Sequence, residues 1–122
     1  MIYEKELTDK IIDCAFNVYR HLGNGFLEKV YENSLASEIK KEGINLIQQH
    51  PIKVYYNNTI VGDYYADIFV ENKIILELKV CSNLQAIHQA QLINYLKATK
   101  IKLGYLLNFG NPKDFEFKRI IY

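Results

Sequence analysis

Two charged side chains stand in a strongly apolar segment, and their spacing is the first sign of chemistry in this sequence. If residues 74–80 are extended, Leu76 and Leu78 share one face, and Glu77 and Lys79 share the other. Burying an unpaired ion costs several kcal/mol even after relaxation, so such a pair needs solvent, a partner or a function. A solvated outer face of a sheet is the simplest alternative.

A second carboxylate lies upstream, because Asp67 belongs to the extended segment that precedes residues 74–80. If residues 71–73 form a three-residue hairpin loop, Val70 pairs with Ile74. Counting back along both strands then places Asp67 directly opposite Glu77. A loop with an even number of residues would put the two carboxylates on opposite faces.

Directly opposed carboxylates, with β-carbons about 5 Å apart, repel each other unless a cation lies between them. Oxygen ligands at that spacing suit Mg²⁺ or Mn²⁺, which keep bound waters and take only a few carboxylates. Lys79 would then be able to contact a scissile phosphate or the attacking water. The pattern is therefore consistent with metal-dependent phosphodiester hydrolysis, with Asp67 and Glu77 as metal ligands.

A third acid, Glu28, falls at an unusual place on a predicted helix. At 100° per residue it lies between Leu35 and Ile39, in the middle of the predicted inner apolar stripe, which consists of Leu27, Val30, Tyr31, Leu35 and Ile39. A carboxylate there should face inward. The alternative is an acid at the start of the helix, favoured by the helix dipole by about 0.3 to 1 kcal/mol.

Polar residues also recur on the helix predicted at residues 84–98. Gln91 and Tyr95 are four residues apart and share a helix face, so both can point at the sheet. His88 lies on the same side, three residues before Gln91. The alternatives are two polar residues on the flank of the helix and a hydrogen-bonded structural histidine.

Together these residues resemble a known pattern. Asp67 followed by Glu77-Leu78-Lys79 resembles the D-x(n)-E-x-K core of the PD-(D/E)XK nuclease superfamily. Gln91 to Tyr95 resembles the Q-x-x-x-Y element of its RecB-like and phage lambda exonuclease-like branches. Gly25 to Tyr31 matches the signature of the GxxExxY family, whose members look like minimal PD-(D/E)XK domains, and that resemblance covers nearly the whole chain.

The resemblance implies roles for the central residues. Asp67 and Glu77 would bind the metal ion, joined by the backbone carbonyl of Leu78. Lys79 would orient or help to deprotonate the attacking water and neutralise developing charge. Gln91 would position that water or Lys79.

Other residues of the matched motifs would complete the site. Glu28 would join the acidic cluster directly, as a further metal ligand, or through a metal-bound water. Tyr31, His88 and Tyr95 are candidates for supporting roles.

The remaining pattern predicts an α+β fold with a mixed sheet, the PD-(D/E)XK restriction-endonuclease-like core that the resemblance also implies. Helical spacing and runs of β-branched and aromatic residues predict the elements in this order: helices at 7–22 and 27–42, strands at 46–56, 60–70 and 73–80, a helix at 84–98, and strands at 101–107 and 117–121. The helix at 84–98 should cross over the sheet between the third and fourth strands.

Composition limits the remaining function classes. A chain of 122 residues, 49% hydrophobic and 24% charged, suits one globular domain over residues 1–122. A net charge of +1 gives no overall attraction to nucleic acid, and the basic excess is confined to residues 97–122. The two cysteines, far apart, exclude a structural zinc site. With no signal-peptide pattern and no membrane-spanning run, we expect a cytoplasmic protein.

The function expected from these residues is Mg²⁺- or Mn²⁺-dependent hydrolysis of phosphodiester bonds, in DNA rather than RNA. The partners would be nucleic acid but no membrane, and a homodimer or larger complex is compatible with so small a domain. Two alternatives stay open: a nucleic-acid-binding or regulatory module with little turnover, and a protein-interaction subunit whose partner supplies the DNA clamp.

Overall fold

A computed structural model describes residues 4–122. Its elements, in chain order, are α1 (Lys5–Leu22), α2 (Glu28–Lys41), β1 (Leu46–Tyr56), β2 (Thr59–Val70), β3 (Ile74–Lys79), α3 (Ala86–Thr99), β4 (Leu103–Asn108) and β5 (Glu116–Ile121). The predicted order of helices and strands is confirmed, with boundaries that shift by one or two residues.

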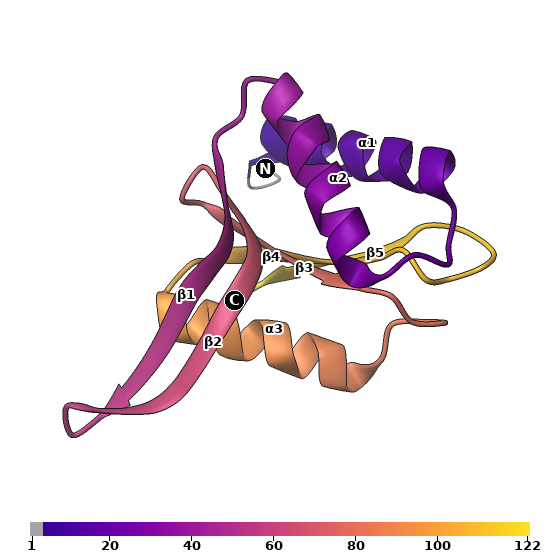
Figure 1. The fold of residues 1–122 in the computed structure, drawn as a ribbon. Helices are drawn as coiled ribbons and strands as arrows, with labels where there is room; N and C mark the ends of the chain where they lie inside the picture. The colour runs from indigo at the N-terminus through magenta and orange to yellow at the C-terminus, as the bar shows by residue number, and fades with distance from the viewer. Residues whose placement is uncertain (1–3) are drawn as a thin grey trace.

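The five strands form one sheet in the order β1-β2-β3-β4-β5. Strands β3 and β4 are parallel and the other neighbours are antiparallel. Helix α3 makes the crossover between β3 and β4, as predicted. Figure 1 shows α1 and α2 on one face of the sheet and α3 on the other. The predicted α+β fold with a mixed sheet is therefore confirmed.

Each face of the sheet carries its own apolar core. Buried residues of α1 and α2 pack against one set of strand residues, which are Ile68, Val70, Ile74, Leu76, Leu78, Leu103, Tyr105 and Leu107. On the other face, Leu92, Tyr95 and Leu96 of α3 pack against Ile52, Ala66, Phe69, Ile75, Leu106 and Ile120. Because Glu77 alternates with Leu76 and Leu78, it belongs to the α3 side.

Strand β2 does not keep one alternation along its length. Ile68 and Val70 pack on the side of α1 and α2, whereas Ala66 and Phe69 both pack on the side of α3. Residues an odd number apart share a face only where a strand twists sharply. The faces of β2 therefore exchange at Asp67, a feature that the regular alternation assumed from sequence missed.

The inner stripe predicted for α2 was partly wrong. Tyr31, Leu35 and Ile39 are fully buried, but Leu27 is 81% exposed and Val30 is 37% exposed. Leu27 precedes the first helical residue, so its side chain is not carried onto the inner face.

Among the described residues, no helix is long and apolar enough to span a membrane. The expected cellular location stays a prediction.

Candidate functional site

The hairpin between β2 and β3 brings Asp67 and Glu77 together. Val70 pairs with Ile74 and Ile68 with Leu76, which confirms the three-residue loop. Beyond this ladder side chains take over the hydrogen bonding: the Asp67 N–H donates to Glu77 Oε1 at 3.0 Å, and the Leu78 N–H donates to Asp67 Oδ2 at 2.8 Å. The predicted proximity of the two carboxyl groups is confirmed.

Burial sets the proton affinity of this pair. Glu77 is only 4% exposed, and its burial, followed by the charge of Asp67, raises its pKa to about 8. Burial also raises the pKa of Asp67, although the Leu78 N–H opposes this effect by stabilising the charged form. Both groups therefore hold protons more tightly than ordinary carboxylates do.

Glu28 reaches the same pair from α2. It is the first residue of that helix, and much of its surface is exposed to solvent. Its carboxyl group nevertheless lies beside that of Asp67, and partial burial followed by the charge of Asp67 raises its pKa to about 7. Glu28 thus occupies a helix N-terminus and also belongs to the acidic cluster, so the two interpretations of this residue are compatible.

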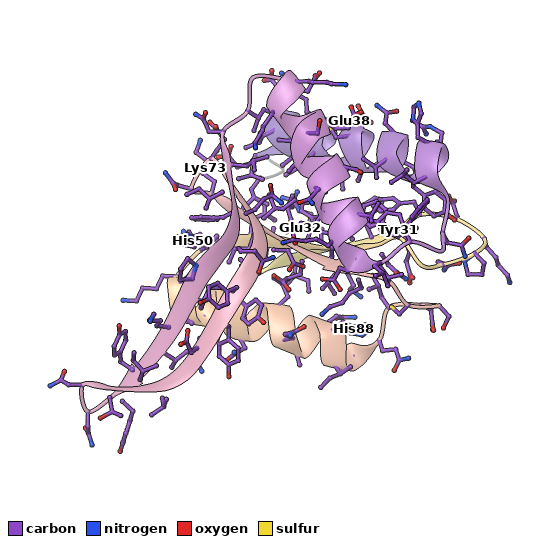
Figure 2. All side chains as sticks on the ribbon, in the orientation of Figure 1. Tyr31, Glu32, Glu38, His50, Lys73 and His88 are labelled. Carbon is purple, nitrogen blue, oxygen red and sulfur yellow. The ribbon has the colours of Figure 1, made fainter. Side chains whose placement is uncertain are left out.

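A fourth acid, Glu32, was missed by the sequence reasoning. Its residue is 2% exposed, and its carboxylate accepts hydrogen bonds from Lys29 Nζ at 3.2 Å, Gln48 Nε2 at 2.7 Å and Gln49 Nε2 at 2.8 Å. Figure 2 shows Glu32 where α2 faces the strands. The signal was available in the sequence, because Glu32 is followed by Leu35 at helical spacing and so belongs to the buried stripe.

A chain of hydrogen bonds joins β3 to α3. Lys79 Nζ donates to Gln91 Oε1 at 2.7 Å, and Gln91 Nε2 donates to the hydroxyl oxygen of Tyr95 at 3.2 Å. Burial, followed by the charge of Glu77, raises the pKa of Tyr95 to about 12. Gln91 and Tyr95 share a helix face that points at the sheet, as predicted, and through Gln91 the helix holds the ammonium group of Lys79.

His88 has a structural role in the described part of the chain. Its Nδ1 accepts the N–H of Gln85 at 3.0 Å and completes a capping box at the start of α3, away from Glu32 in Figure 2. No contact joins it to the acidic cluster within residues 4–122, so the structural alternative describes this histidine.

Tyr31 is likewise part of the scaffold. Its hydroxyl accepts the N–H of Phe26 at 3.2 Å and donates to the carbonyl of Gly23, while its ring stacks on Phe109 with centroids 4.9 Å apart. Within residues 4–122 its hydroxyl shows hydrogen bonds to Phe26 and Gly23 and none to the acids. It supports the site by holding the turn that leads into Glu28.

The donor set suits a hard divalent cation. Asp67 and Glu77 each use one oxygen for a backbone N–H. Their other oxygens could bind a metal ion: these are Glu77 Oε2 and Asp67 Oδ1, which has a longer contact of 3.4 Å with Gln49 Nε2. No three His, Cys, Asp or Glu side chains within residues 4–122 are gathered closely enough to form a ready metal site. Mg²⁺ typically takes one or two carboxylates and keeps several waters, so these donors fit it in kind and number.

Comparisons with known proteins bear on the family and the fold of this chain. The sequence matches a family model described as the PD-(D/E)XK nuclease superfamily over residues 5–120. A solved structure titled "Crystal structure of SSO0001" has the same fold, with a TM-score of 0.60 and 19% identity. The alignment covers 98% of this chain and 59% of that one, so this chain spans little more than half of the larger protein. No curated protein matches the sequence.

Proposed function

Because the chain belongs to the PD-(D/E)XK nuclease superfamily, we propose that it hydrolyses phosphodiester bonds in DNA with Mg²⁺ or Mn²⁺ as cofactor. The observation that carries the proposal is the Asp67–Glu77 pair. The buried carboxyl group of Glu77 and the half-buried one of Asp67 each accept a hydrogen bond from a backbone N–H of the hairpin, and desolvation together with neighbouring charge raises the pKa of both. Such an arrangement stabilises the folded protein poorly until a cation neutralises it.

Asp67, Glu77 and the backbone carbonyl of Leu78 would hold the cation. When bound, a divalent cation supplies Lewis-acid polarisation of the phosphate and lowers the pKa of a water molecule. Glu28 would contact the ion directly or through water, from the start of α2. These assignments agree with the oxygens that the backbone leaves available on both carboxylates.

Lys79 would stabilise the negative charge that develops on the phosphate and orient the attacking water. Its hydrogen bond to Gln91 fixes the ammonium group, since a lysine side chain otherwise samples many rotamers. Tyr95 holds the amide of Gln91 in turn. The role of Gln91 is therefore to position Lys79.

The test is cleavage of single-stranded, duplex and branched DNA and of RNA by the purified protein, with Mg²⁺, Mn²⁺ or EDTA. We expect cleavage of DNA that requires the metal and is lost in Glu77→Gln. Asp63→Asn, which changes an exposed carboxylate on the same strand as Asp67, is the matched control and should keep full activity. Metal-independent cleavage, or equal activity in Glu77→Gln, would contradict the proposal.

A second candidate function is a protein-interaction module that keeps the fold without turnover. The β1–β2 hairpin extends beyond the body of the protein in Figure 1, and residues 54–62 at its end carry no charge. Tyr56 is 69% exposed there and Val61 is 60% exposed. Absence of cleavage on every substrate, with self-association that is lost when Tyr56 and Val61 are replaced by serine, would favour this function.

A further inference from the structure

Gln49 has an unusual backbone for a residue inside a strand. Its φ is 53°, which lies in the left-handed region that residues other than glycine rarely adopt. The other non-glycine residues with positive φ in residues 4–122 lie at hairpin turns or next to helix ends. Backbone strain of this kind persists where the surrounding structure enforces it, and it concentrates at functional sites.

The register shows what this conformation achieves. Gln48 pairs with Ile68 and His50 pairs with Ala66, so the register of β1 against β2 is the same before and after Gln49. Gln49 itself stands opposite Asp67, where the faces of the hairpin exchange. Neighbouring strand residues normally point to opposite faces, yet Gln48 and Gln49 both reach the carboxylate of Glu32.

The amide of Gln49 lies between two acids. Its Nε2 donates to Glu32 Oε1 at 2.8 Å and makes a longer contact of 3.4 Å with Asp67 Oδ1. Asp67 Oδ2 is already held by the Leu78 N–H. The carboxylate of Asp67 is therefore held at both oxygens, and the long contact leaves Oδ1 able to accept a cation.

Satisfying Glu32 does not explain this arrangement. Lys29 and Gln48 already donate to that carboxylate, and they do so without unusual backbone conformations. Of the three side chains that donate to Glu32, Gln49 is the one that also has a hydrogen bond to Asp67, at Oδ1. The strained backbone is thus connected with Asp67.

We propose that Gln49 is a positioning residue, which bridges Glu32 and Asp67 and fixes the Asp67 carboxylate in the orientation that receives the metal ion. The inference rests on the proposed function. It adds a residue from β1 to a site otherwise built from α2, β2, β3 and α3.

The experiment compares Gln49→Gly with Gln48→Ala. Glycine accepts the left-handed backbone and removes the side chain with its amide, and because Gln49 is exposed no buried cavity is created. Gln48→Ala removes a neighbouring amide that also binds Glu32 but does not touch Asp67. We expect Gln49→Gly to weaken Mn²⁺ binding about 10-fold or more, the usual effect of losing a group that orients a metal ligand, while Gln48→Ala stays within about twofold.

A second measurement uses the metal-free protein, so that it does not depend on metal binding. In nuclear magnetic resonance spectra we expect Asp67→Asn to shift the side-chain amide signals of Gln49 and to leave those of Gln48 in place. Unchanged Gln49 signals, or Mn²⁺ binding by Gln49→Gly equal to the wild type, would overturn the inference. A wild type that binds no Mn²⁺ but shows the amide shift would refute the proposed function and keep Gln49 as the residue that orients Asp67.

Discussion

Replacing Glu77 with glutamine should make the metal-free protein more stable at neutral pH, although it removes a group of the candidate site. The side chain is 4% exposed, so solvent screens its charge little. Glutamine keeps the Oε1 atom that accepts the Asp67 N–H, so the backbone geometry need not change. What the substitution removes is a carboxyl group that the fold holds in its protonated form.

The magnitude follows from the pKa of this group. The fold raises it from 4.5 to about 8, so the folded protein binds the proton more tightly than the unfolded chain does. The resulting stability is fully present below pH 4.5 and is lost as the pH rises through about 8. At about 1.4 kcal/mol per pKa unit, the loss between pH 5 and pH 8 is on the order of 3 kcal/mol.

The assay is thermal unfolding in EDTA from pH 5 to pH 9 for the wild type, Glu77→Gln and the control Asp63→Asn. For a domain of this size ~3 kcal/mol corresponds to a melting-temperature difference of roughly 10 °C. Glu77→Gln should match the wild type near pH 5 and exceed it by several degrees, up to roughly 10 °C, at pH 8. If the melting temperatures of the wild type and Glu77→Gln changed in parallel with pH, or if the variant were less stable at pH 8, the raised pKa assigned to Glu77 would be refuted.

Three further outcomes are expected. Lys79→Ala should lower cleavage by orders of magnitude and destabilise the metal-free protein, since it removes the ammonium group whose charge lowers the pKa of Glu28, Asp67 and Glu77; cleavage within about twofold of the wild type would contradict its role. Mn²⁺ affinity, measured by calorimetry, should rise with pH and level off above about 8, because the cation must displace protons from Glu28, with a pKa of about 7, and from Glu77, with a pKa of about 8. Tyr31→Phe should cost about 1 to 3 kcal/mol in denaturant unfolding, through the lost partner of the Gly23 carbonyl, and leave Mn²⁺ affinity unchanged; a tenfold loss of affinity would make Tyr31 part of the site.

Local pattern was sufficient for the element order and for the central pair of acids. Strand alternation and an odd loop length fix which side chains of a hairpin stand opposite one another, so Asp67 and Glu77 followed from counting residues. The same holds for Gln91 and Tyr95, because a spacing of four residues places two side chains on one helix face. These relations depend on backbone geometry alone.

Tertiary structure decided what local spacing leaves open. His88 had the spacing of a site residue, but the start of α3 uses its ring as a cap. Glu32 had the spacing of a core residue, and the packing of α2 against β1 supplied two of the donors, Gln48 and Gln49, that let a buried carboxylate replace an apolar side chain.

Two backbone features that complete the site cannot be predicted from a periodic sequence pattern. The left-handed backbone at Gln49 and the exchange of faces at Asp67 lie in segments that the sequence predicts as ordinary strands. A single residue in an uncommon backbone region is enforced by its surroundings rather than by its own propensity, since glutamine has no preference for that region. The sequence by itself therefore determined which acids meet, and the packing of the hairpin against α2 and α3 determined how their oxygens are oriented.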